Sequence, residues 1–129
     1  MFTIEAIKAA HAQVKSGADF PAYIQAIKAL GVTYYKTFVT DSHTLYYGEE
    51  AYTQSSEPKY APLAISDEVN MGEFKIALLN HQRGGTDYMQ FCRDCAAHGV
   101  DKWAVSLSAM TCTYFDKKGN ELLVEEIPA

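Results

Sequence analysis

The sequence predicts an α+β fold in which two helix-helix-β-hairpin halves form an antiparallel sheet packed against helices. Apolar residues follow helical spacing and then a period of two, this order occurs twice, and the two occurrences align without a gap when Asp19 is placed on Asp87. A chain of 129 residues is the usual size of one domain. We therefore expect a single domain over residues 1–129, with halves at about 3–66 and 69–127.

The first half is expected to begin with two helices. Residues 3–15 carry apolar side chains at three- and four-residue steps, with Thr3 as a possible N-cap and Ser16-Gly17 as a stop. Asp19 is suited to cap a second helix, and Gly31 is suited to end it. The spacing thus predicts a helical hairpin.

The chain then changes to a period of two. Residues 32–39 and 44–47 alternate as the strands of a β-hairpin do. The polar stretch 49–62 predicts a long excursion with a short strand around Tyr52, and residues 63–65 predict a further strand.

The second half repeats this order. Residues 71–82 have helical spacing, and Gly84-Gly85 breaks the pattern. Asp87 or Thr86 is expected to cap the next helix, which Gly99 ends. Three strands are predicted after it, over residues 102–107, 111–115 and 121–126.

The alignment of the halves that places Asp19 on Asp87 also places Gly31 on Gly99, and it matches several aromatic residues as well. Internal duplication explains these matches. Cap preferences alone would produce some of them, so two similar units without a common origin are the alternative. The repeat predicts that both helical pairs cover one face of the sheet, whose inward side chains are Tyr35, Thr37, Val39, Trp103, Val105 and Leu107.

The outward strand faces of the two halves differ. Tyr34 and Phe38 correspond to Lys102 and Ser106, which predicts an aromatic patch on the first hairpin only. Such a patch can mark a ligand or subunit interface. Burial of the patch under residues 49–62 is the alternative.

Two further segments contain candidate binding residues. The excursion carries Glu57, Lys59 and Tyr60, and long loops often carry function. His81 and Arg83, at the end of a predicted helix, have the chemistry to bind an anion. The structural alternatives are an ordinary crossover between the halves and a cationic helix end that complements the macrodipole.

Cys92 and Cys95 form a CxxC motif, and His98 follows at the next helical step. A closed zinc site needs four ligands, and a redox motif belongs at a helix N-terminus. The repeat instead aligns these residues with apolar positions of the first half, namely Ile24, Ile27 and Leu30. We therefore expect core residues here, with metal or redox chemistry as the alternative, and we predict no metal and no cofactor.

Asp41, Ser42 and His43 are the residue types of a hydrolase triad. Consecutive turn residues point apart, however, and turn chemistry explains these types. The sequence therefore predicts no catalytic residues.

Charge and cysteine content limit the partners and the cellular location that we expect for this protein. A net charge of -5 with scattered Lys and Arg argues against nucleic acid, and the short apolar runs argue against a membrane span. An odd cysteine count and a start without a secretory signal predict a reducing, cytoplasmic location. A small molecule or a protein is the expected partner, and a homodimer is left open.

Several stretches resemble a known family. The run GTDYMQFCRDCAAHGVDKWAVSLSAMTCTYFDKKGNELLVEEIP, the segment SEPKY and the opening FTIEAIKAAHAQVKSGADFPAYIQAIKALGV resemble a bacterial family of domains of unknown function. Some members lie in cryptic prophages of enterobacteria, and many carry the label phage envelope protein. The resemblance implies an α+β fold and a bacterial cytosolic protein, and it implies no catalytic residues.

These observations favour a non-catalytic binding module that uses the aromatic hairpin surface and the 49–62 excursion. One alternative is a small enzyme whose acid-base groups come from His81, His43 or nearby carboxylates. Another is a phage-associated structural or stress protein.

Overall fold

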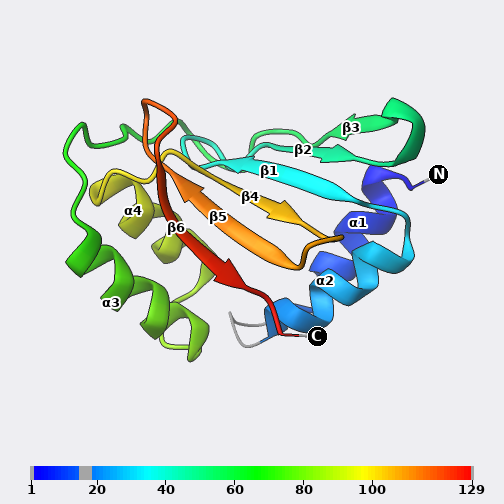
Figure 1. Ribbon diagram of the computed structural model, residues 1–129, viewed down its shortest axis with the longest axis horizontal. Coiled ribbons are helices and arrows are strands. Elements are labelled where there is room, and N and C mark those ends of the chain that lie inside the picture. The colour runs from blue at the N-terminus through cyan, green and yellow to red at the C-terminus, as the bar shows by residue number, and fades with distance from the viewer. Residues whose placement is uncertain (1, 15–18, 129) are drawn as a thin grey trace.

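The computed structural model describes residues 2–14 and 19–128 (Figure 1). The first half contains α1 (Ile4–His11), α2 (Phe20–Ala29), β1 (Tyr34–Phe38), β2 (Thr44–Tyr47), the 3-10 helix η2 (Glu49–Ala51) and β3 (Thr53–Ser55). The second half contains α3 (Met71–Gln82), α4 (Tyr88–Ala97), β4 (Lys102–Ser106), β5 (Thr111–Phe115) and β6 (Glu121–Glu126).

The strands form one antiparallel sheet in the order β3-β2-β1-β4-β5-β6. Figure 1 shows the helices on one side of this sheet, with α1 and α2 near one end of the strands and α3 and α4 near the other. The predicted α+β class is therefore confirmed. The predicted inward side chains are all buried, namely Tyr35, Thr37, Val39, Trp103, Val105 and Leu107.

The two halves pair their strands in the same way. The register of β1 with β2 recurs between β4 and β5 under the same alignment that relates the halves in sequence. At the centre of the sheet Lys36 lies opposite Ala104, and these two residues are equivalent in that alignment. A local twofold axis therefore passes between β1 and β4. A common origin of the halves stays a prediction.

Both second helices end in the same type of turn. Gly31 has φ 105° and Gly99 has φ 86°, which L side chains adopt only with strain. The N–H of the following residue, Val32 or Val100, then bonds to a carbonyl in the last turn of the helix. These are the C-terminal caps that the glycine positions predicted.

Some local predictions need correction. Residues 63–65 form no strand in the described chain; Leu63 instead exchanges hydrogen bonds with Thr40 at the β1–β2 turn. The short strand expected around Tyr52 begins one residue later, as β3. The first helix ends at His11, and the expected stop at residues 16–17 lies outside the described residues.

Candidate functional site

A pocket of about 490 Å³ lies between the two helical pairs, over the buried face of the sheet. All of the helices α1 to α4 or the residues next to them contribute side chains, as do β1, β2, β4, β5 and the end of β6. Both halves therefore contribute to the lining of the pocket.

Aromatic rings form the floor of the pocket. Tyr35 and Tyr46 face each other across β1 and β2, with ring centroids 5.6 Å apart. Trp103 and Tyr114 occupy the equivalent positions on β4 and β5, with centroids 6.5 Å apart. Alternate residues of a strand share one face, so the period-two pattern directs all four rings toward the helices. Each half thus contributes one cross-strand aromatic pair.

Two imidazoles line the pocket. The His11 ring meets Tyr23 and Tyr88 edge-on, at 5.3 and 5.9 Å between centroids. His81 stacks on Phe91 at 4.4 Å. Burial lowers the pKa of both histidines below 6.5, and the nearby Lys59 ammonium lowers the pKa of His11 further. Both rings are therefore mostly neutral at pH 7 and can act as hydrogen-bond donors or acceptors.

Lys59 comes from the excursion between the halves. It is an exposed residue, but its ammonium nitrogen lies over the Tyr88 ring, 5.4 Å from the centroid. Partial loss of water lowers the pKa of this ammonium, and Lys8 lowers it further. Lys59 also lines a second pocket of about 300 Å³, next to Glu57. The lysine thus lies at the boundary of the two pockets.

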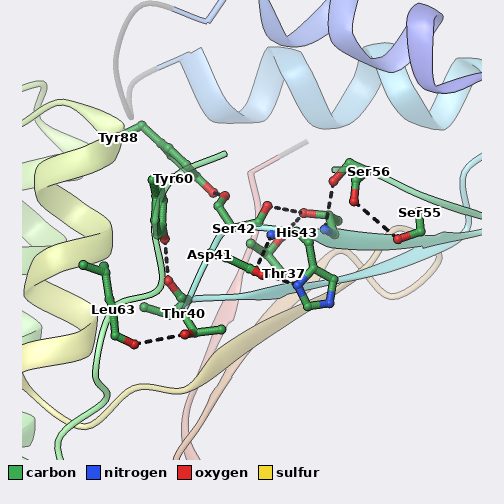
Figure 2. Close-up of polar contacts among 12 residues, drawn as sticks. Thr37, Thr40, Asp41, Ser42, His43, Ser55, Ser56, Tyr60, Leu63 and Tyr88 are labelled. Carbon is green, nitrogen blue, oxygen red and sulfur yellow. Dashed lines mark hydrogen bonds and ion pairs between the residues drawn. The ribbon is translucent and has the colours of Figure 1, made fainter. Parts of the chain in front are cut away.

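Hydrogen bonds hold the excursion and α4 against the first hairpin. Ser42 Oγ and the Tyr88 hydroxyl are 2.5 Å apart, and Figure 2 shows the two groups turned toward each other. The Tyr60 hydroxyl donates to the Val39 carbonyl. The amide of Ser66 donates to the Ala96 carbonyl in α4. The Ser42–Tyr88 and Ser66–Ala96 bonds join the two halves, and Tyr88 is part of the pocket wall.

The side chains of Asp41, Ser42 and His43 do not form the chain of hydrogen bonds that a hydrolase triad needs. Asp41 Oδ1 accepts from the backbone N–H of His43 at 3.0 Å and lies 2.6 Å from its Nδ1. Ser42 is fully buried and points to Tyr88, away from the His43 ring (Figure 2). His43 stacks on Phe38 at 4.5 Å, on the helix-free face of the sheet. The aspartate and histidine do pair, contrary to the expected divergence, but the serine is not aligned with them.

The two buried thiols of the CxxC belong to the core. Cys92 and Cys95 are fully buried, and Cys112 is also buried and free. Burial raises the pKa of all three thiols, to about 12 for Cys112. Within residues 2–14 and 19–128, no group of three or more His, Cys, Asp or Glu could hold a metal ion. His98 is only half-buried, at the C-cap of α4, so its expected core position was wrong.

The predicted site residues divide between two faces. Tyr34 and Phe38 lie on the helix-free face and are half-buried, Tyr34 against Tyr47 at 5.6 Å and Phe38 against His43. Part of the excursion pairs with β2 as β3, and its residues Lys59 and Tyr60 contact the Tyr88 ring and the Val39 carbonyl. The binding hypothesis assumed that the aromatic patch and the excursion form one surface. The structure instead places Tyr34 and Phe38 on one face of the sheet and Lys59 in a pocket on the other.

The remaining predicted residues lie on the helix side or at the end of α3. Lys59 and His81 line the main pocket, and Glu57 lines the second one. Tyr60 is half-buried against the core. Arg83 is exposed at the C-cap of α3. Burial lowers the pKa of His81, so Arg83 is the side chain that can supply the positive charge expected at this helix end.

Sequence reasoning missed most of the pocket wall, including His11, Tyr46, Tyr88 and Trp103. A signal was present. Bulky aromatic residues recur at matched inward positions of the two halves, where a close-packed core would use aliphatic side chains as readily.

The described residues contain no helix that is long and apolar enough to cross a membrane. A family model described as "Protein of unknown function (DUF1398)" matches residues 8–126. No curated protein matches the chain.

Proposed function

Since the chain belongs to the DUF1398 family, whose description assigns no activity, we propose a function from the pocket: the protein binds a small molecule between its two halves. The observation that carries this proposal is the pocket of about 490 Å³ over the sheet. Sites for small ligands usually have volumes of roughly 300–1,000 Å³.

The chemistry of the walls supports the proposal. Ligand sites combine apolar and aromatic walls with a few polar groups that fix orientation. Here the cross-strand rings and α4 supply the aromatic surface, and His11, His81 and Lys59 supply polar atoms. The ligand is therefore a largely apolar molecule with a small number of polar groups.

Binding fits this arrangement better than acid-base catalysis. Asp41 and His43 form a close pair, but they belong to the hairpin turn and His43 packs on the opposite face of the sheet. His81 Nδ1 is engaged by the carbonyl and hydroxyl oxygens of Thr86, at 3.1 and 3.2 Å. A small enzyme remains the alternative, and it predicts that a bound molecule is chemically altered. Mass spectrometry of the recovered ligand distinguishes the two functions.

A titration with a neutral fluorescent probe tests the proposal. N-phenyl-1-naphthylamine fluoresces more strongly when it leaves water for an apolar site, so we expect saturable enhancement with the wild-type protein. Val14→Phe fills part of the pocket and should weaken binding at least about tenfold. Val124→Phe is the matched control, because Val124 is 52% exposed on β6.

Two results would contradict the proposal. One is the absence of saturable enhancement with the wild-type protein. The other is equal affinity of the Val14→Phe and wild-type proteins. Chromatography of the purified protein tests the phage-structural alternative, which predicts large assemblies.

A further inference from the structure

Lys59 is a charged residue of the pocket lining that forms no ion pair within the described residues. It is the one lysine or arginine among the described residues that line the main pocket. Within the described part of the chain, no carboxylate oxygen lies within 4.0 Å of its ammonium nitrogen. Its defined neighbour is the face of Tyr88, which attracts a cation but adds no negative charge.

The other groups near Lys59 can assist an anion but cannot replace one. His11 lines both pockets with Lys59, and burial keeps its imidazole mostly neutral. A neutral imidazole can donate one hydrogen bond to an acid group without repelling a neighbouring cation. Tyr88 presents its ring, because its hydroxyl is already bonded to Ser42.

The carboxylates of the pocket lie toward the opposite edge of the sheet. Glu125 and Glu126 belong to β6, and β6 is separated from β2 by β1, β4 and β5. The side-chain amide of Gln82 donates to Glu125 at 3.0 Å, so that carboxylate already has a partner. The pocket is therefore positive on the excursion side and negative on the β6 side.

The second half has no equivalent of this cation. Lys59 corresponds to Ile127 when the halves are aligned, and both are tied to a hairpin turn by their backbone amides. Lys59 N–H donates to the Asp41 carbonyl, and Ile127 N–H donates to the Met110 carbonyl, each at 2.8 Å. Ile127 is buried and closes its side with apolar surface. A matched position thus carries a charge in one half only.

We propose that the ligand is an aromatic acid whose ring lies between the aromatic walls and whose carboxylate or sulfonate pairs with Lys59. The aromatic body follows from the rings of Tyr46, Tyr88 and Trp103 in the pocket lining, because aromatic rings favour offset-stacked or edge-on contacts with one another. The acid group follows from a cation that lines the pocket and has no carboxylate oxygen within 4.0 Å among the described residues. This inference rests on the proposed small-molecule function.

Three probes that share the biphenyl group and carry an anionic, a neutral or a cationic end group test the inference. Biphenyl-4-acetate, biphenyl-4-acetamide and 2-(biphenyl-4-yl)ethylamine are used to displace N-phenyl-1-naphthylamine from the wild-type protein. We expect the acetate to bind at least about tenfold more tightly than the amide, and the amine to bind most weakly. Quenching of Trp103, the single tryptophan of the chain, reports occupancy independently.

Variants of Lys59 show whether this lysine causes the preference. Lys59→Met keeps most of the side-chain length and should bring the acetate to within about twofold of the amide, while Lys59→Arg should retain the preference. Lys75→Met is the control, because Lys75 is exposed on α3.

Each failure has its own meaning. Equal binding of acetate and amide by the wild-type protein overturns the acid assignment and leaves small-molecule binding intact. A preference that survives Lys59→Met overturns the role of Lys59. If the neutral naphthylamine does not bind, the proposed function fails and this inference fails with it.

Discussion

The two halves of the molecule share one plan and differ in a few side chains. Both place two helices before a hairpin, end the second helix at a glycine with positive φ, and continue into a third strand. Even the left-handed residue of the β1–β2 turn, Ser42 at φ 63°, has a counterpart in Met110 at φ 55°. The backbone is therefore the common element, and the side chains carry the differences.

Those differences gather at the pocket. Lys59 of the first half stands where the second has Ile127, and Thr44 stands where the second has Cys112. The Tyr88–Ser42 hydrogen bond has no equivalent, because Phe20 and Met110 occupy the related positions. A nearly symmetric scaffold thus surrounds an asymmetric pocket, so we expect the proposed ligand to bind in one orientation.

The largest expected effect on stability comes from alanine substitutions at two equivalent core positions. Ile24→Ala should lower the free energy of unfolding by about 3–4 kcal/mol, because a fully buried branched side chain leaves a cavity. Cys92→Ala, at the equivalent position, removes one sulfur atom and should cost only about 1 kcal/mol. Urea denaturation followed by circular dichroism measures both. A much larger loss for Cys92→Ala that added zinc reverses would restore the metal interpretation.

The next largest effect is expected from alanine substitutions at the two capping glycines, which should lower stability by different amounts. An alanine at either position is strained by about 1–2 kcal/mol at positive φ. At Gly31 the new Cβ meets nothing within 4 Å, whereas at Gly99 it would lie 2.6 Å from the Glu68 carbonyl oxygen. We expect losses of about 1 kcal/mol for Gly31→Ala and about 3 kcal/mol for Gly99→Ala in the same denaturation assay. Equal losses would show that the segment around Glu68 moves aside freely.

The hydrogen bond between the halves should have a smaller effect. Tyr88→Phe leaves the fully buried Ser42 hydroxyl without this partner and should cost about 1–2 kcal/mol. The double variant Ser42→Ala/Tyr88→Phe should be less destabilised than the sum of the single variants, since it removes both polar groups. Strict additivity in thermal unfolding would mean that the two groups do not interact.

The smallest effect concerns pH. The folded pKa values of His11 and His81 lie below 6.5, so the unfolded chain binds more protons as the pH falls through this value. Their contribution to stability is therefore complete above pH 6.5 and decreases toward the lower folded values. Denaturation at pH 7.5 and pH 5.5 should show a decline that is reduced in the His11→Gln/His81→Gln variant. An unchanged decline in that variant would assign the pH effect to other groups.

Local patterns predicted much of the fold because helix caps, glycine stops and strand alternation depend on neighbours in the chain. The ranges of β2, α3, β5 and β6 agree with the predictions. Residues 63–65 were wrong for the same reason, because a short apolar run looks like a strand whether or not a neighbouring strand is free to pair with it. The 49–62 excursion was recognised, but its path toward α4 depends on distant contacts.

The sequence by itself determined the α+β class, the order of the elements, the inward strand faces and the burial of Cys92 and Cys95, because periodicity and the internal alignment encode them. Only the tertiary structure decided that Tyr34 and Phe38 lie on one face of the sheet while Lys59 and His81 line a pocket on the other. Pockets arise where elements distant in sequence fail to fill the space between them. That space depends on how the two helical pairs pack over the sheet, which no local pattern records.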